Sequence, residues 1–294
     1  MQQRNETALQ RKLTKIFAAK ILSILFLVFA VTSSSQALAA TSAETYYKKG
    51  MFSLKQRHHE EALLCFNRAL SVEPNYVPAL VQRAELYLLL EQYSKAQKDC
   101  QKTLSLKTVP DKLVAKAHKI LADCHIENGN YRQADQELDQ VIALDCTQSG
   151  YFMCRGDVSK VLNKNDQAIK DFSAAITLQH GQSFKAHWSR GDVYVRLGRH
   201  SEAVKDYTTA IAQNPKRADR IYVCRAQAYI KLAMYQKSVD DCSLALLHLG
   251  RSNAAQRQDY SALNLRASAY EKLGKKALAE KDRQAMRRID DFEI

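Results

Sequence analysis

Eight histidines, seven cysteines and 31 acidic residues are the side chains that could carry chemistry in this chain, and their spacing limits what they could do. A zinc site would need cysteines or histidines at short, fixed spacings, and the sequence has no Cys-x-x-Cys or Cys/His combination of that kind. His118 and His125 lie seven residues apart, and His58 and His59 are adjacent, without an acidic or thiol partner at metal-binding spacing. We interpret the histidines as solvated or packing residues and predict no metal.

Motifs for the common catalytic mechanisms do not occur in the sequence. There is no Gly-x-x-x-x-Gly-Lys loop to hold a phosphate, no His-Glu-x-x-His and no Gly-x-Ser-x-Gly. Glycine (9) and proline (4) are scarce in the 294 residues, which favours long helices over a turn-rich sheet protein. We therefore predict a helical protein that is not an enzyme and has no catalytic residues and no cofactor.

Residues 1–40 have the three parts of a secretory signal. A basic stretch ends at Lys20, an apolar core of 11 residues follows from Ile21 to Val31, and an Ala-x-Ala site of small residues lies within positions 37–40. The apolar core is shorter than the roughly 20 residues that cross a membrane. We expect either a signal peptide cleaved after Ala39 or Ala40, or an uncleaved anchor within residues 21–40. Either alternative predicts an exported protein, periplasmic or secreted, that could remain anchored to the membrane.

A 34-residue pattern recurs along the rest of the chain. Phe184–Arg217 shows it in full, with Gly191 in the eighth place, Ala203 in the twentieth and Pro215 in the thirty-second. The frame fits seven times, starting at Ala43, Val77, Ala115, Ser149, Phe184, Asp219 and Tyr260. Small residues hold the eighth place (Gly50, Ala84, Ala122, Gly156, Gly191, Ala226, Ala267) and the twentieth (Ala62, Ala96, Ala134, Ala168, Ala203, Ser238, Ala279). Larger side chains where two helices cross would force the helix axes apart.

The period and the recurring residues resemble the tetratricopeptide repeat, a helix-turn-helix unit of 34 residues. The resemblance covers residues 41–294 and implies an all-α, right-handed α-solenoid, or superhelix, of about seven repeats. The repeats lie near residues 43–76, 77–110, 115–148, 149–183, 184–217, 219–252 and 260–293. Extra residues before Ala115 and before Tyr260 are interpreted as longer turns between repeats, although the second insertion could instead extend a helix.

Arginine and aspartate occur together at two places of the frame. Five repeats have arginine in the seventh place (Arg83, Arg155, Arg190, Arg225, Arg266), and the same five have aspartate in the twenty-third (Asp99, Asp171, Asp206, Asp241, Asp282). The other two repeats have neither residue. We predict that each arginine pairs with the aspartate on the second helix of its own repeat; the alternative is a ladder of arginines that faces a ligand.

The resemblance also implies a concave groove lined by the first helices of the repeats, through places two, five, nine, twelve and thirteen. Acidic residues fill the ninth place of four successive repeats, three repeats have a basic residue in the second place, and Met153 and Trp188 occupy the fifth. The predicted partner-binding residues are Glu85, Lys116, Asp123, Met153, Asp157, Lys185, Trp188, Asp192 and Arg220. Trp188 lies one place after the usual core aromatic, which is His187 here, so it could face the groove as an anchor or pack in the core. The acidic stripe could bind a basic or amphipathic helix, or it could be balanced by neighbouring lysines and arginines.

The resemblance implies that the protein binds a peptide or protein segment and acts as a scaffold or assembly factor. An alternative is a structural component of the cell envelope that associates with itself. The net charge of +13 favours acidic partners or surfaces and raises the question of RNA binding. An acidic groove centre argues against RNA, and no small-molecule substrate is indicated. The places that bind the C-terminal carboxylate of heat-shock chaperones in this family hold Tyr47, Met51, Gln82 and Ile120, so that clamp is absent.

Overall fold

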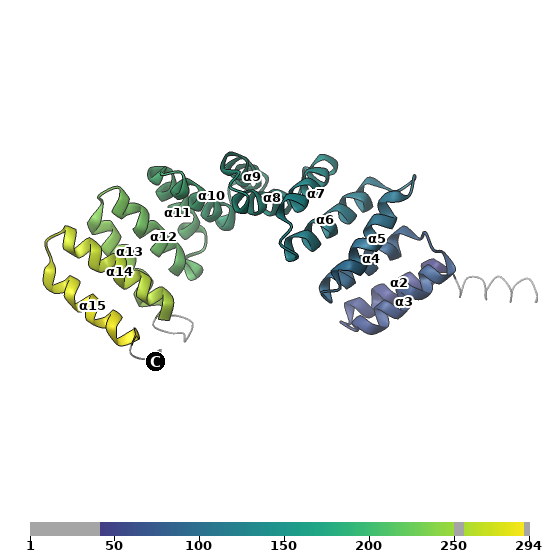
Figure 1. Ribbon diagram of the computed structural model, residues 1–294, viewed down its shortest axis with the longest axis horizontal. Coiled ribbons are helices and arrows are strands. Elements are labelled where there is room, and N and C mark those ends of the chain that lie inside the picture. Colours follow the sequence, from purple (N-terminus) through teal and green to yellow (C-terminus); the bar gives the residue numbers. More distant parts are fainter. Residues whose placement is uncertain (1–41, 250–255, 291–294) are drawn as a thin grey trace, which may run out of the picture. The chain divides into compact units, whose positions relative to one another are not determined.

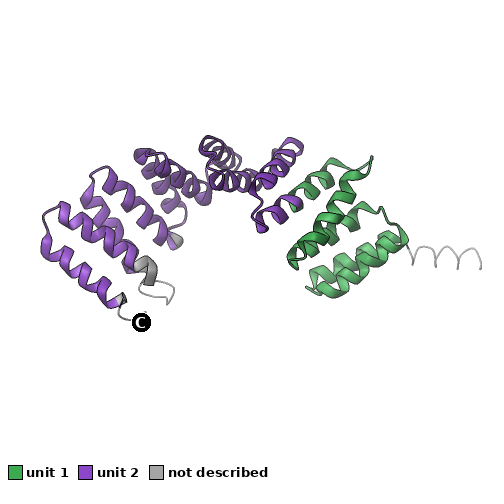
Figure 2. Cartoon of the chain, viewed as in Figure 1, with its two compact units in different colours: residues 1–120 green, residues 121–294 purple. Residues whose placement is uncertain are grey.

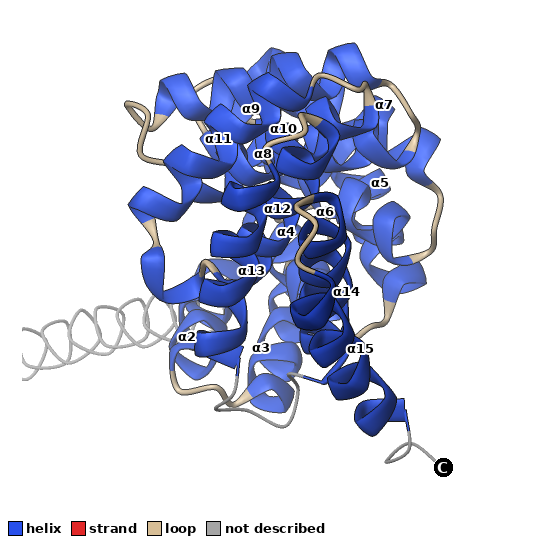
Figure 3. Ribbon diagram, turned by 90° about the vertical axis from the view of Figure 1, so that its left-hand side faces the viewer, coloured by secondary structure: helices blue, strands red, loops and turns tan. Residues whose placement is uncertain are grey.

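The computed structural model describes residues 42–249 and 256–290, so the predicted signal in residues 1–40 lies outside the described residues. Within the described ranges the chain forms fourteen α-helices and one short 3₁₀ helix, η1 (Pro215–Arg217), with no strand (Figures 1 and 3). The fold class is the predicted one, an all-helical repeat solenoid. None of the described helices is long and apolar enough to cross a membrane.

The chain divides into two compact units, residues 1–120 and 121–294 (Figure 2), and each is described by itself. The first contains α2 (Ala43–Lys55), α3 (His59–Val72), α4 (Val77–Leu89), α5 (Tyr93–Ser105) and the beginning of α6 (Asp111–Glu127). The second contains the rest of α6, α7 (Tyr131–Leu144), α8 (Ser149–Val161), α9 (Asn165–Leu178), α10 (Phe184–Arg196), α11 (His200–Gln213), α12 (Asp219–Lys231), α13 (Tyr235–Leu249), α14 (Gln256–Lys272) and α15 (Lys276–Asp290).

Each repeat is a pair of helices joined by a tight turn, and one residue of every turn has a left-handed backbone. This residue always holds the fifteenth place of the 34-residue frame, with φ between 55° and 73°. The place holds glycine in three repeats and other residues in four: Arg57, Glu91, Gly129, Asn163, Gly198, Ala233 and Gly274. The turn geometry is therefore common to all repeats, even where the residue type does not favour it.

The predicted crossing residues of the eighth and twentieth places are buried in all seven repeats. A methyl group added to Gly50, Gly156 or Gly191 would lie 2.6–2.7 Å from a ring carbon of Phe66, Phe172 or Tyr207, so only glycine fits beside these rings. The other four repeats have alanine in the eighth place. Their twenty-fourth place, which holds the ring elsewhere, has Cys100, Leu138, Cys242 or Arg283. Glycine thus accompanies a ring, and alanine accompanies a non-aromatic residue.

The interpretation of the insertion before Ala115 as a longer turn is wrong. The extra residues extend the helix, because α6 begins at Asp111 and runs for 17 residues, whereas α2, α4, α8, α10 and α12 have 13. Pro110 precedes the first residue of α6 and its carbonyl accepts the amides of Leu113 and Val114, so the proline marks the beginning of the helix rather than the middle of a loop. Residues 256–259 of the second insertion likewise belong to α14, which begins at Gln256, whereas residues 250–255 lie outside the described residues.

Candidate functional site

The arginines of the seventh place are held inside the fold. In all five repeats the arginine Nε and Nη2 donate to the two carboxylate oxygens of the predicted aspartate, at 2.6–3.0 Å. Nη1 donates to a polar side chain of the preceding repeat, which is Asn67, Asp139, Ser173, Thr208 or Ser243. The predicted pairing is confirmed. Because the guanidinium groups are occupied by these contacts and largely buried, they are not a ladder that faces a ligand.

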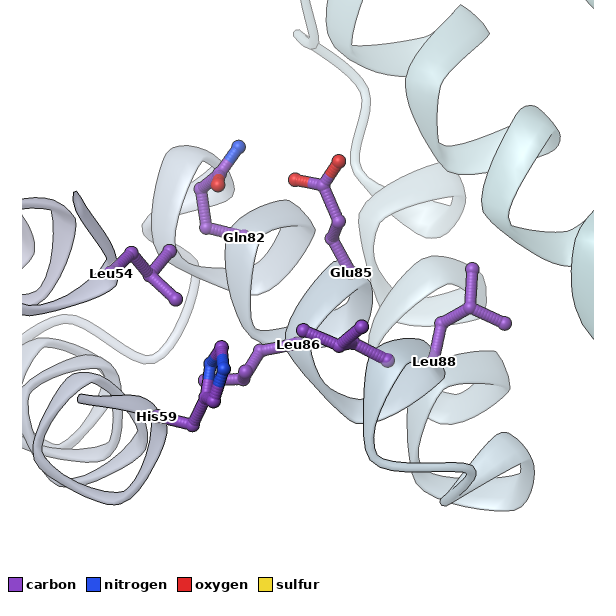
Figure 4. Close-up of a pocket in the computed structure, with 7 residues that line it drawn as sticks. Leu54, His59, Gln82, Glu85, Leu86 and Leu88 are labelled. Atoms are coloured by element: carbon purple, nitrogen blue, oxygen red, sulfur yellow. The ribbon is translucent and has the colours of Figure 1, made fainter. Parts of the chain in front are cut away.

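In unit 1, the predicted residues Glu85 and Lys116 form an ion pair of 2.7 Å between Oε2 and Nζ. Beside Glu85 is a mostly apolar hollow of about 460 Å³ between the end of α2, the start of α3 and α4 (Figure 4). Leu54, Leu88 and Leu89 line it together with His59. These leucines hold the twelfth and thirteenth places, which belong to the predicted groove although the predicted binding residues include none from these places.

In unit 2, Trp188 and Arg220 are brought together. The guanidinium carbon of Arg220, on α12, lies 5.8 Å from the centre of the Trp188 ring, on α10. Trp188 is half-buried against the cluster that contains Tyr207 and Ile221, whereas His187 is buried and its Nδ1 lies 2.8 Å from Asp206. Thus His187 fills the core place, and Trp188 lies between core and surface. Its indole nitrogen is buried next to Cys224, and hydrogen bonding by the indole acts to lower the pKa of that thiol.

Asp192 follows Trp188 by one helical turn and is half-buried. The hydroxyl of Tyr207 donates to its Oδ1 at 2.8 Å. Burial raises the pKa of Asp192, while the hydrogen bond from Tyr207 and the charges of Lys160, Arg196 and Arg220 act in the opposite direction. The carboxylate is therefore partly satisfied within the fold, by residues of α8, α10, α11 and α12.

The remaining predicted residues of unit 2 lie on α6, α8 and α10. Asp157 is exposed and its Oδ1 lies 3.5 Å from Nζ of Lys160, while Lys185 also acts on it through its charge. Met153 packs against the buried cluster of Ala168, Phe172 and Val193. Asp123 is half-buried, and its charge adds to burial in raising the pKa of the Cys124 thiol to about 11.

Sequence reasoning missed four residues of this surface: Lys160, Arg196, Tyr207 and Cys224. Lys160 and Arg196 hold the twelfth and thirteenth places, so the groove places of the frame could have found them. Tyr207 holds a place that predicts packing alone, and its hydroxyl contact with Asp192 depends on how α10 and α11 cross. Cys224 holds the sixth place, next to the groove, and burial raises its pKa to about 11, so it is a protonated thiol at neutral pH.

The described part of the chain contains no group of three metal-binding side chains. None of the seven cysteines, all of which lie in the described ranges, forms a disulfide, and Cys100, Cys124 and Cys242 are fully buried. Burial raises the pKa of Cys242 to about 12, which is the behaviour of a packing residue rather than a nucleophile. The site is thus a surface of helix faces with one half-buried tryptophan and several charges, which is suited to contact with another macromolecule.

Repeated helix pairs of this kind define a helical repeat protein. Three sequence models of the tetratricopeptide repeat match residues 43–76, 65–98 and 156–218. The chain therefore carries tetratricopeptide repeats, as its sequence pattern predicted.

Known proteins with similar sequence or structure are consistent with this fold. FK506-binding protein 59 of Drosophila melanogaster is 26% identical over 100 residues, which are 34% of this chain and 23% of that protein. The C-terminal part of a tetratricopeptide protein from Cytophaga hutchinsonii superimposes with a TM-score of 0.71 at 18% identity, over 83% of this chain and 95% of that one. MamA (TM-score 0.54, 23% identity, 61% of this chain and 95% of that one) and YrrB, described as a tetratricopeptide protein with an unusual peptide-binding site (TM-score 0.54, 17% identity, 62% and 93%), are also similar. At these identities the structural similarity establishes the fold alone.

Proposed function

We propose that this protein is a non-enzymatic scaffold that binds a segment of another protein across α8, α10 and α12 of unit 2. Tetratricopeptide repeats support a protein-interaction role in general, and the peptide-binding site of YrrB supports a peptide ligand. The observation that carries the proposal is Trp188. It is the only tryptophan in the chain, and it is half-buried at a helix surface against the cluster of Tyr207 and Ile221. A large aromatic side chain that is anchored in the fold and partly exposed is typical of the residues that dominate protein interfaces.

The surface around Trp188 has an apolar floor formed by one residue from each of three successive first helices. Met153, Trp188 and Val223 all hold the fifth place of their repeats and all are half-buried. Helices α8 and α10 contact each other, as do α10 and α12, so these three residues follow one line across the unit. Repeats that contact only their neighbours bind extended ligands through many modest contacts.

A peptide selection tests the proposal and does not require the partner to be identified first. Random peptides displayed on phage are selected on the full chain, and synthetic versions of the enriched peptides are titrated by anisotropy and by the fluorescence of Trp188. We expect binding to weaken at least tenfold in Trp188→Ala, which is the size of a modest hot spot. Phe52→Ala is the matched control, because Phe52 is an aromatic residue of unit 1 that is 65% exposed.

Two results would count against the proposal. Enriched peptides that bind the parent and Trp188→Ala equally would place the interface elsewhere on the repeats. Failure to enrich any peptide, together with oligomers that grow with concentration in light scattering, would favour the self-associating structural component.

We also propose, from residues 1–40, that the repeats act outside the cytoplasmic membrane. N-terminal sequencing of the chain after expression in a bacterial host should give a mature protein that begins at Ala40 or Thr41. A full-length chain that sediments with membranes would indicate the anchor, and a full-length chain in the cytosolic fraction would contradict export.

A further inference from the structure

Four cationic side chains surround two carboxylates on the proposed surface of unit 2. Lys160 and Lys185 act on Asp157 through their charges, and Lys160, Arg196 and Arg220 act on Asp192. Lys160 is shared, so the surface has four positive charges against two negative ones. The local excess has the same sign as the +13 charge of the chain.

The carboxylates already have partners, whereas two of the cations have no carboxylate in contact with them. Asp192 accepts a hydrogen bond from Tyr207, and Asp157 lies 3.5 Å from Lys160. Among the described residues, neither Lys185 nor Arg220 has a carboxylate oxygen within 4.0 Å, and both side chains are exposed. Arg196 donates to neutral oxygens, with its shortest contact to the backbone carbonyl of Lys160 at 2.6 Å.

Arg220 is also held in place. Its guanidinium lies over the Trp188 ring, and a cation that stacks on an aromatic ring keeps its N–H groups free for an acceptor in the plane of the guanidinium. A carboxylate bound there would lie next to the apolar floor of Met153, Trp188 and Val223. One ligand segment could then place an apolar side chain on the floor and an acidic side chain on Arg220.

On the basis of the proposed function, we infer that the protein segment bound by α8, α10 and α12 is acidic. Its aspartate or glutamate side chains pair with Arg220 and Lys185, and an apolar side chain packs on Trp188. The cations thus select the ligand by charge complementarity and raise its association rate, while the tryptophan supplies the anchor. The acidic stripe of Asp157 and Asp192 sets the spacing between the cations and does not itself recruit a basic helix.

A nucleic acid fits this surface less well than an acidic peptide. A phosphate backbone carries charge at regular short intervals and would meet the carboxylates of Asp157 and Asp192 between the cations. Stacking of a base needs a whole open aromatic face, whereas half-buried Trp188 exposes only part of its ring, enough for contact with one apolar side chain.

The test compares peptide charge and two matched pairs of substitutions in the full chain. We expect peptides enriched on the parent to carry an excess of Asp and Glu over the starting library, with at least one apolar residue. The double variant Lys185→Gln, Arg220→Gln should bind these peptides about tenfold more weakly, because two partly exposed ion pairs are lost. The control Lys170→Gln, Lys205→Gln removes the same charge from exposed lysines of the second helices α9 and α11 and should change binding less than twofold. Amidation of the peptide C-terminus should leave the affinity unchanged, because the ligand is read through side-chain carboxylates.

The outcomes separate this inference from the proposed function. Enriched peptides that are neutral or basic but still depend on Trp188 would overturn the acidic ligand and leave the scaffold role intact. Acidic peptides that bind Lys185→Gln, Arg220→Gln as tightly as the parent would overturn the assigned cations. A 20-nucleotide poly-uridine RNA that binds more tightly than the selected peptides, at equal salt, would replace the protein ligand by a nucleic acid.

Discussion

Packing between glycine and a ring at the helix crossing gives the sharpest prediction for this fold. In Gly156→Ala the new methyl group would lie 2.6, 2.9 and 3.0 Å from three ring carbons of Phe172, which is itself fully buried. Forcing a methyl group into a filled core typically costs about 1–3 kcal/mol. Alanine in place of a helical glycine stabilises the helix by about 1 kcal/mol through its higher helix propensity. We therefore expect a net loss of about 1 kcal/mol in the free energy of unfolding.

A second substitution in the same pair should be energetically coupled to the first. Phe172→Leu removes the ring and copies the third repeat, where Ala122 and Leu138 occupy the same two places and are both buried. Alone it leaves a void and should cost about 1–2 kcal/mol. Combined with Gly156→Ala it should cost less than the sum of the two single changes, with a coupling of about 1 kcal/mol.

Urea unfolding followed by circular dichroism measures these differences, with midpoints compared at constant slope. The control is Gly150→Ala on the same helix, because an added methyl group there meets no atom within 4 Å. That variant should be neutral or slightly more stable than the parent. Equal destabilisation by Gly156→Ala and Gly150→Ala, or additive losses in the double variant, would refute the packing explanation.

Three further predictions concern the turns and the buried pairs. At the fifteenth place, Gly198→Ala should destabilise the fold and Ala233→Gly should stabilise it, each by about 1 kcal/mol in thermal unfolding, because both positions have a positive φ. Stability changes of the same sign in the two variants would exclude backbone strain as the cause. Asp171→Ala leaves a buried arginine without its carboxylate and should cost about 3 kcal/mol in urea unfolding, against less than about 0.5 kcal/mol for the exposed control Asp166→Ala. Burial acts to raise the pKa of Asp206, but hydrogen bonds from Arg190 and His187 outweigh it and leave the pKa below its ordinary value. This carboxylate therefore stabilises the fold at pH values above its unfolded pKa of about 3.9. The stability that Asp206→Asn loses at pH 7 should shrink as the pH falls below about 4. A stability difference between parent and variant that stays constant with pH would contradict this explanation.

The sequence could predict the features that depend on one repeat at a time. The small residues at the crossings and the five arginine–aspartate pairs recur at fixed places, so a periodic frame detects them without coordinates. Their cause is local, because both members of each pair belong to the two helices of one hairpin. The same frame does not decide which of His187 and Trp188 takes the core place, because the two residues are adjacent in the sequence and a small rotation of α10 would exchange them. The structure decides it, because His187 meets the buried carboxylate of Asp206 and so takes the core place.

The charge of the candidate surface could not be predicted in the same way. Asp192 belongs to α10, but its environment includes Lys160 from α8, Tyr207 from α11 and Arg220 from α12. These residues hold four different places of the frame, so no single column of the repeat reveals that they meet. An acidic stripe in the sequence is therefore consistent both with a ligand site and with an internally balanced surface.

The sequence by itself was enough to predict an all-helical repeat solenoid, because its 34-residue period with small residues at two fixed places resembles the tetratricopeptide repeat, a unit of two packed helices. Only the tertiary structure decided where the inserted residues before Ala115 go, which side chains neutralise the acidic stripe and why some crossings have glycine and others alanine. Each of these depends on the distance between atoms of different helices, and a change of about 1 Å in that distance separates a filled crossing from a clash.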